Sequence, residues 1–352
     1  MFYLNENLKN LNRIFDQHER KNFLRLDLNE NPTGLPDEVI KNVLKKVDKT
    51  MISQYPETLA FTELLAKHNG CNIENLCLTN GSSEAIRYII QAFTSENGKI
   101  VGVVPSYFMF QIYSEMYNRN FVGINYQNDL EMPIDSITSA LTDDTELLIL
   151  LNPNNPMGNV YSEEEFERIL KVCKEKQITV MIDEAYHYFY PKTFIKHALN
   201  NRRVLVTRTF SKLFSLAGCR LGYVCGHPED IKYIQKLCTP HNVNAFGILF
   251  ATEILSNPEV LENLIKDFNA GRKYLVEELN KMSYSYYGEY GNFIFIKPKT
   301  NAEKLVSRMK TEKNILIKKY ANVGMLGDCL RVSIGNKEVM KIFMDSLKEL
   351  DK

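Results

Sequence analysis

The chain has 352 residues, of which 44% are hydrophobic and 11% aromatic, so it can bury sizeable cores and is not largely disordered. Its 43 Lys and Arg residues balance 43 Asp and Glu residues, and this zero formal charge gives no reason to expect nucleic acid or an anionic membrane as a partner. No apolar run approaches the roughly 20 residues of a membrane span, and the seven cysteines form no Cys-x-x-Cys pair, so we expect a cytoplasmic protein with reduced thiols.

Short apolar runs alternate with amphipathic stretches from residue 76 onward. Six runs predict strands, at residues 76–79, 100–104, 147–151, 178–182, 204–207 and 221–224. Amphipathic patterns between several of them predict helices, at residues 83–94, 107–118 and 163–176. Short apolar strands joined by helices indicate an α/β fold, with a mostly parallel sheet flanked by helices on both faces.

The pattern changes after Pro240, where long helical stretches appear. These cover residues 246–255 and 258–282, and they are followed by a further helix from Ala302. Short apolar runs lie among and after them, at residues 293–296, 315–317 and 330–334. We therefore predict an N-terminal arm (residues 1–30), a large domain (31–240) and a smaller α+β domain (241–352).

Several familiar sites are excluded or disfavoured. Residues 180–184 are an apolar run ending in Asp-Glu, as in a Walker B strand, but the partner phosphate loop is missing because Gly98-Lys99 is followed by Ile100. There is no G-x-G-x-x-G turn and no zinc-type Cys or His spacing. His187 lies near two carboxylates, but its aromatic neighbours indicate packing, so we expect no metal.

Polar motifs follow the ends of the predicted strands. They are Gly81-Ser82-Ser83-Glu84, Pro105-Ser106-Tyr107, Asn152 to Gly158, Asp183-Glu184-Ala185-Tyr186, and the stretch from Thr207 to Tyr223 that contains Ser211-Lys212 and Arg220. Parallel sheets bind their ligands at the carboxyl ends of the strands. The motifs therefore predict one shared site, although a lone lysine at a strand end is usually only solvated.

In order and approximate spacing, these motifs resemble those of fold-type I pyridoxal-phosphate enzymes in the class I/II aminotransferase superfamily. The histidinol-phosphate aminotransferase branch is the most similar. The resemblance extends from Asn29-Glu30-Asn31-Pro32 to Leu330-Arg331-Val332-Ser333. It implies pyridoxal 5'-phosphate as the cofactor and transamination as the reaction.

The resemblance also assigns roles around the cofactor ring. Lys212 matches the lysine whose amine forms a Schiff base with the cofactor aldehyde and then shuttles a proton. Asp183 matches the carboxylate that keeps the pyridine nitrogen protonated. Asn155 and Tyr186 match residues that hydrogen-bond the 3-oxygen of the ring, and Tyr107 matches the aromatic residue that stacks on it.

The cofactor phosphate is expected at the start of the helix after Gly81. The matching residues are Gly81, Ser82, Ser83, Thr209, Ser211 and Arg220. Backbone amides at a helix start favour an anion. Tyr55, in Gln54-Tyr55-Pro56, matches a tyrosine that reaches the phosphate of the neighbouring subunit, which implies a homodimer with shared active sites.

Substrate recognition departs from the family pattern at two positions. Arg331 matches the arginine that grips an anionic group of the substrate, and Asn31 belongs to the same expected set. Lys318 stands where a second arginine is usual, and His241 stands where Tyr or Phe is usual. Both departures bear on substrate choice and leave the cofactor residues unchanged.

The expected function is an aminotransferase that moves an amino group from an amino acid, with glutamate as the expected donor, to a small phosphorylated carbonyl compound. The alternative is a phospho-amino-acid decarboxylase of the threonine-phosphate or serine-phosphate type, which keeps the same cofactor residues. A third interpretation is a ligand-sensing module of a transcription regulator. It is disfavoured because Lys212 is present and the residues before Asn29 are too few for a DNA-binding domain.

Overall fold

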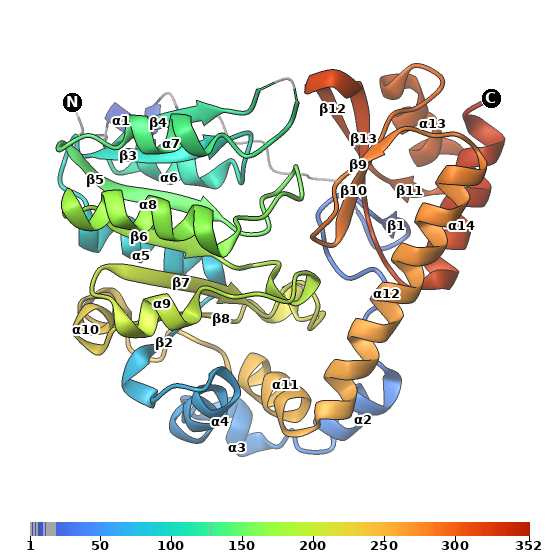
Figure 1. Ribbon diagram of the computed structural model, residues 1–352. Coiled ribbons are helices and arrows are strands. Elements are labelled where there is room, and N and C mark those ends of the chain that lie inside the picture. Colours follow the sequence, from blue (N-terminus) through green and yellow to red (C-terminus); the bar gives the residue numbers. More distant parts are fainter. Residues whose placement is uncertain (1, 3, 5, 10, 12–18, 128) are drawn as a thin grey trace.

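The computed structural model describes residues 2, 4, 6–9, 11, 19–127 and 129–352. Its centre is a seven-stranded sheet with the strand order β2-β8-β7-β6-β5-β3-β4 (Figure 1). Strand β8 runs antiparallel to both its neighbours, and the remaining strand pairs are parallel. The strands are β2 (Leu76–Thr79), β3 (Lys99–Val104), β4 (Asn120–Asn125), β5 (Thr145–Leu151), β6 (Thr179–Asp183), β7 (Val204–Thr209) and β8 (Gly222–Gly226).

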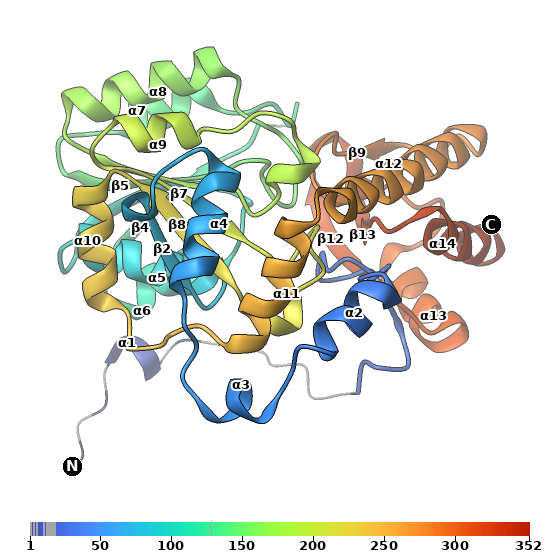
Figure 2. The same cartoon turned by 90° about the horizontal axis from the view of Figure 1, so that it is seen from below.

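Helices cover both faces of this sheet because its central strands are apolar on both sides. Every residue of β6, β7 and β8 is buried. Figure 2 shows α7, α8 and α9 on one face, and α5, α6 and α10 on the other. Their bounds are α5 (Ser82–Phe93), α6 (Met109–Met116), α7 (Ile134–Ala140), α8 (Glu163–Glu175), α9 (Ile195–Asn200) and α10 (Pro228–Leu237). The predicted α/β class with a mostly parallel sheet is confirmed.

The parallel register brings the carboxyl ends of β5, β6 and β7 together. Leu151, the last residue of β5, pairs with Asp183, the last residue of β6, and Asp183 pairs in turn with Thr207 of β7. The loops that follow these strands therefore start at one edge of the sheet, and they carry the polar motifs of the sequence.

A second sheet lies in the C-terminal part of the chain. It is antiparallel, with the order β12-β13-β10-β9. Helices α12 and α14 pack against each other beside it (Figure 1). The elements are β9 (Tyr286–Tyr287), β10 (Phe293–Ile296), β12 (Lys318–Val323), β13 (Gly327–Ser333), α12 (Pro258–Lys281), α13 (Ala302–Lys313) and α14 (Lys337–Leu350).

The N-terminal region contacts both parts. Strand β1 (Leu24–Arg25) pairs in parallel with β11 (Ile315–Leu316), and α2 (Asp37–Leu44) packs against α11 (Ala245–Ser256). Helix α11 also packs against α4 (Leu59–Asn69), which lies beside the large sheet. The shorter helices are α1 (Glu6–Lys9) and α3 (Lys49–Ser53).

The division into an arm and two domains stays a prediction. Residues 1, 3, 5, 10 and 12–18 of the predicted arm lie outside the described residues. Within the part of the chain that the structure describes, no helix combines the length and apolar character needed to cross a membrane.

Candidate active site

The strand-end motifs meet in one pocket. Nine of the predicted site residues line it, together with Leu151 and Ala185. The nine are Ser82, Ser83, Tyr107, Asp183, Tyr186, Thr209, Ser211, Lys212 and Arg220. They come from the start of α5, from the ends of β6 and β7, and from the loops after β3, β6 and β7. The predicted convergence at the carboxyl edge of the sheet is therefore present in the fold.

One end of the pocket is rich in hydrogen-bond donors. Gly81 precedes α5 with a φ of +75°, and no side chain among the described residues caps this helix. A Cβ on Gly81 would lie 2.7 Å from Nη2 of Arg220, so glycine lets the guanidinium lie against the turn. Nη1 of Arg220 donates to Oγ of Ser211 at 3.3 Å. Helix-start amides, hydroxyls and a guanidinium together suit a phosphate.

Asp183 is fully buried at the end of β6. Its Oδ1 accepts hydrogen bonds from Oγ1 of Thr207 at 3.0 Å and from the amide of Ala185 at 3.1 Å. Burial raises the pKa of Asp183 to about 7, while these two hydrogen bonds and the charge of Lys212 pull it down. A positively charged partner in the pocket would keep this carboxylate ionised.

Lys212 carries an amine with an unusual proton affinity. Its Nζ donates to the carbonyl of Leu28 at 3.2 Å and lies 5.6 Å from the ring centroid of Tyr186. Burial and then the positive charge of Arg331 lower the pKa of Lys212 to about 8. A much larger share of this amine is therefore neutral at neutral pH than for an ordinary lysine, which makes it a nucleophile.

Tyr186 and Tyr107 add two aromatic rings to the pocket. The hydroxyl of Tyr186 accepts a hydrogen bond from Nδ2 of Asn29 at 3.0 Å, and burial raises the pKa of Tyr186. Tyr107 packs edge-on against Phe110, with a centroid distance of 5.5 Å, and its hydroxyl lies 3.4 Å from Oγ of Ser83. Both rings are thus held by contacts outside the pocket.

Arg331 is buried on β13, and Asn155 lies against it. Nη1 of Arg331 donates to Oδ1 of Asn155 at 2.9 Å and to the hydroxyl of Tyr320 at 3.0 Å. Its Nε is buried and finds no hydrogen-bond partner among the described residues. A buried guanidinium with an unused donor is suited to an anionic ligand. Asn155, expected at the cofactor ring, has Arg331 as its observed partner.

Six predicted residues lie outside the pocket lining, namely Gly81, Asn155 and Arg331, described above, and three more. Tyr55 is 77% exposed and stacks on His241, with ring centroids 4.3 Å apart. Asn31 donates from Nδ2 to Oγ of Ser215 at 2.7 Å, in the loop after Lys212. Lys318 is exposed on β12, where it is the register partner of Arg331 on β13. The binding roles of all three stay predictions.

Two residues of the site were missed from the sequence. Asn29, which holds Tyr186, lies in the Asn29-Glu30-Asn31 motif, but Asn31 was the residue selected. Thr207, which holds Asp183, lies two positions before Thr209 on β7. Alternation along the strand puts both threonines on one face, and this signal could have identified Thr207.

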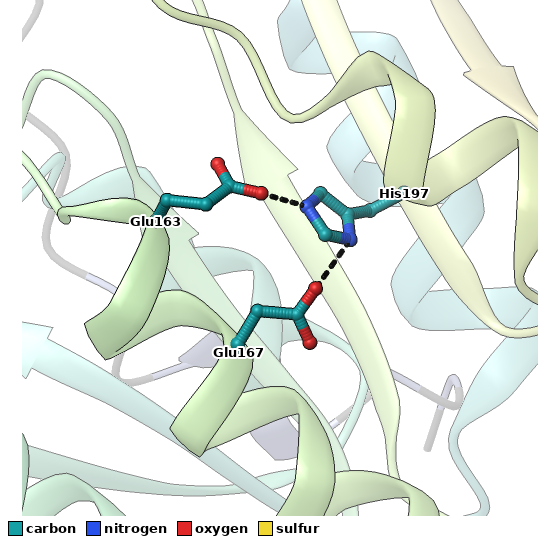
Figure 3. A group of neighbouring side chains, drawn as sticks. All are labelled: Glu163, Glu167 and His197. Atoms are coloured by element: carbon teal, nitrogen blue, oxygen red, sulfur yellow. Dashed lines mark hydrogen bonds and ion pairs between the residues drawn. The ribbon is translucent and has the colours of Figure 1, made fainter.

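A cluster outside this pocket combines a histidine with two carboxylates (Figure 3). Nε2 of His197 on α9 lies 2.6 Å from Oε1 of Glu163, and its Nδ1 lies 3.5 Å from Oε1 of Glu167. Both carboxylates come from α8, one helical turn apart. Because each ring nitrogen faces a carboxylate, the cluster serves as a contact between α8 and α9.

The profile of the family Aminotransferase class I and II matches residues 21–347. The chain belongs to this family. It is 31% identical to the histidinol-phosphate aminotransferase of Caldanaerobacter subterraneus subsp. tengcongensis over 330 residues, which is 93% of this chain and 92% of that protein. The predicted membership of the class I/II superfamily is confirmed.

Solved structures share the fold. The histidinol-phosphate aminotransferase of Sinorhizobium meliloti in complex with pyridoxal-5'-phosphate superimposes with a TM-score of 0.87 and 20% identity, over 99% of this chain and 97% of that one. The L-threonine-O-3-phosphate decarboxylase of Porphyromonas gingivalis superimposes with a TM-score of 0.77 and 22% identity, over 93% of this chain and 98% of that one.

The enzyme is a pyridoxal-phosphate-dependent aminotransferase similar to histidinol-phosphate aminotransferases. The donor set of the pocket fits this cofactor. The Gly81 turn with Arg220 suits its phosphate, the buried carboxylate of Asp183 suits a protonated ring nitrogen, and the amine of Lys212 suits its aldehyde.

The lowered pKa of Lys212 predicts how cofactor attachment depends on pH. Apoenzyme is mixed with pyridoxal phosphate at pH 6 to 10, and the attached cofactor is fixed with borohydride at timed intervals. We expect the rate to rise up to about pH 8 and then level off, because the amine is neutral above its pKa of about 8. An ordinary lysine would give a rise up to about pH 10.4.

Two variants control this measurement. Lys212→Ala should fix no cofactor, and Arg331→Leu should move the plateau to higher pH, because the charge of Arg331 lowers the pKa of Lys212. Labelling of another lysine, or a rate that still climbs beyond pH 9.5, would disprove the assignment.

Proposed function

We propose that this enzyme transfers an amino group from an amino acid, with glutamate as the donor, to a small phosphorylated carbonyl compound, in the manner of a histidinol-phosphate aminotransferase. The observation that carries the proposal is the cofactor pocket at Lys212 and Asp183, close enough to buried Arg331 for its charge to lower the pKa of Lys212. The histidinol-phosphate aminotransferase that is 31% identical supports the choice of substrate.

In this proposal each residue of the pocket has a separate task. Bound pyridoxal phosphate supplies an electrophilic carbon and a ring that takes up electrons from the substrate Cα. Nζ of Lys212 would hold the cofactor through its aldehyde carbon, and the same amine would move the proton at the substrate Cα. Asp183 would keep the ring nitrogen protonated. Tyr107 would pack on the ring, and Asn155 and Tyr186 would offer polar groups to its 3-oxygen.

The remaining pocket residues bind the phosphate. Ser82 and Ser83 offer the first amides of α5, and the hydroxyls of Thr209 and Ser211 lie 2.9 Å apart. Arg220 donates to the same Ser211 hydroxyl, so the guanidinium is already oriented before the phosphate binds. An anion here replaces hydrogen bonds among the donors with shorter, charge-assisted ones.

A second anion site, for the substrate, is proposed around Arg331 and Lys318. These residues are register partners on β13 and β12, so their side chains leave the same face of the sheet. Tyr320 lies on that face too, and its ring centroid is 5.2 Å from Cζ of Arg331 and 5.9 Å from Nζ of Lys318. Asn31 is proposed as a further substrate contact.

Arg331 and Lys318 should contribute unequally. Arg331→Ala should lower kcat/KM for both half-reactions by about 30- to 4000-fold, the equivalent of about 2–5 kcal/mol for a partly buried charged hydrogen bond. Lys318→Ala should lower it less, and more for a phosphorylated than for a non-phosphorylated substrate. Steady-state kinetics with one substrate of each kind measure both effects.

Lys318→Arg is the matched control for that series. It keeps the positive charge and adds the planar guanidinium, which can donate two parallel hydrogen bonds. The variant should therefore shift the preference between acceptors without abolishing activity. If Lys318→Ala leaves both substrates unaffected, Lys318 is a surface residue and takes no part in substrate binding.

A substrate panel tests the proposed reaction. Histidinol phosphate with 2-oxoglutarate should yield glutamate, and histidinol without its phosphate should react at a rate at least about tenfold lower, since each 1.4 kcal/mol of lost binding is tenfold. If both compounds react at the same rate, the proposal of a phosphorylated substrate is wrong, but the assignment as an aminotransferase stands.

O-phosphothreonine and O-phosphoserine, supplied without an amino acceptor, complete the panel. Release of carbon dioxide from either would favour the decarboxylase that remains the alternative function. The decarboxylase from Porphyromonas gingivalis shares the fold at 22% identity, and a shared fold does not fix the reaction.

We also propose a homodimer in which Tyr55 reaches the phosphate site of the other subunit. Tyr55 and Ile52 are 77% and 67% exposed and lie three positions apart in the sequence, so they offer apolar surface to a partner subunit. Tyr55→Phe keeps the ring that stacks on His241 and removes only the hydroxyl. It should weaken cofactor retention by about 1.5–3 kcal/mol, the value of a hydrogen bond to a charged group.

Equilibrium dialysis of the cofactor and sedimentation velocity give the two measurements. A stable monomer with full activity, or unchanged retention of the cofactor in Tyr55→Phe, would contradict the shared site.

A further inference from the structure

Two cysteines outside the cofactor pocket lie side by side. Sγ of Cys77 and Sγ of Cys238 are 3.4 Å apart, although the residues are 161 positions apart in the sequence. Cys77 is the second residue of β2, and Cys238 is the C-cap of α10. Helix α10 packs directly against β2, so two rigid elements hold the sulfur atoms near each other.

The two thiols differ in exposure. Cys77 is 5% exposed, whereas Cys238 is half-buried, and both line a surface pocket of about 420 Å³. The hydrogen bond from the Cys77 thiol lowers the pKa of Cys238, and the same bond, with burial, raises the pKa of Cys77. Cys238 is thus the accessible nucleophile and Cys77 its protonated neighbour.

We propose that Cys77 and Cys238 are a modification site, at which a hydroperoxide converts the two thiols into a reversible intrachain disulfide. The thiolate of Cys238 attacks one peroxide oxygen, the O–O bond breaks, and the leaving oxygen is protonated and released as water or an alcohol. Cys77 then attacks the sulfenic sulfur of Cys238, forming the S–S bond and releasing water. Two thiols lose two electrons in total, and the peroxide gains them.

The disulfide would link the segment between α10 and α11 covalently to β2. This strand leads into the turn at Gly81, where the cofactor phosphate is proposed to bind. Nδ2 of Asn242 already donates to the carbonyl of Leu78 at 2.9 Å and to Oε2 of Glu84 at 3.2 Å. That carboxylate oxygen also accepts the amide of Asn80 at 2.8 Å, one residue before Gly81. A covalent bond at Cys238 would add a third link to this segment, and unlike the two hydrogen bonds of Asn242 it would not open and close.

A second thiol pair provides an internal comparison. Cys71 and Cys225 also interact, since the Cys225 thiol lowers the pKa of Cys71. Cys225 pairs across the sheet with Leu76, next to Cys77, so strand alternation puts the two thiol pairs on opposite faces of the sheet. Cys71 is half-buried, as Cys238 is, and Cys225 is fully buried in the core, so the feature that distinguishes the first pair is the surface pocket that both of its thiols line.

Peroxide titration of the cofactor-loaded enzyme tests the site. After treatment with hydrogen peroxide the free thiols are alkylated, and unreduced peptides are mapped by mass spectrometry. We expect the seven free thiols to fall to five, with Cys77 joined to Cys238. The rate should not depend on protein concentration, and dithiothreitol should restore all the thiols.

Three variants distinguish a specific disulfide between Cys77 and Cys238 from unspecific oxidation of the thiols. Cys238→Ser and Cys77→Ser should each abolish the disulfide, and Cys219→Ser, a change at another half-buried thiol, should leave it unchanged. Because Cys238 is half-buried, its serine variant should fold even if the variant of Cys77 does not. A disulfide between Cys71 and Cys225 alone, or oxidation of Cys238 to sulfinic acid while Cys77 stays alkylatable, would overturn the proposal.

Amide hydrogen exchange tests whether the disulfide restrains the segment after α10, which the thiol measurements alone do not show. In the oxidised wild type the amides of Thr239, His241 and Asn242 should exchange at least about threefold more slowly than in the reduced enzyme, and Cys238→Ser should show no change on oxidation. If the amide exchange rates of the oxidised wild type are unchanged, the disulfide does not restrain this segment and that part of the proposal is wrong.

Discussion

A buried ion pair beneath the cofactor pocket holds the strand ends from which the site is built. Nη2 of Arg208 lies 2.7 Å from Oε2 of Glu184, and both side chains are almost fully buried. Glu184 follows Asp183, and Arg208 stands between Thr207 and Thr209. Strand alternation therefore sends one set of side chains into the pocket and this ion pair to the opposite face. Removing one partner of such a pair typically costs about 3–5 kcal/mol, because the other charge is left buried.

Further hydrogen bonds extend this constraint to neighbouring segments. The amide of Phe194 donates to Oε1 of Glu184 at 2.7 Å, and Nη1 of Arg208 donates to Oδ1 of Asn69 at 2.9 Å, so α9 and α4 are tied to the same pair. The pocket residues Asp183 and Thr209 thus stand on a scaffold whose polar groups are satisfied. Burial can raise the pKa of Asp183 and lower that of Lys212 because this scaffold excludes water from the strand ends.

Much of the fold could be predicted from the sequence, since most strands of the large sheet are buried along nearly their whole length and read as continuous apolar runs. The predicted run at 76–79 is β2 and that at 293–296 is β10, residue for residue. Strand β4 (Asn120–Asn125) is only half-buried and was missed, although residues 121–124 form a short apolar run. The antiparallel direction of β8 could not be predicted, because apolar periodicity carries no information on strand direction. In the site, each pocket residue lies at or after the end of a strand, which made nine of them identifiable. Pairings such as that of Asn29 with Tyr186 depend on packing between segments far apart in the sequence.

The two sheets contribute different parts of the site, and their charges are coupled. The large sheet supplies Asp183 and the loop of Lys212, and the C-terminal sheet supplies Arg331. The positive charge of Arg331 lowers the pKa of Lys212, so the free amine is partly neutral before it takes up the cofactor. An anionic group bound at Arg331 offsets this charge, and the pKa of Lys212 then rises. In the proposed roles, the binding event that positions a substrate would thus also increase the affinity of Lys212 for the proton it is to accept. The placement of Arg331 relative to the pocket would therefore affect both substrate binding and the basicity of the amine.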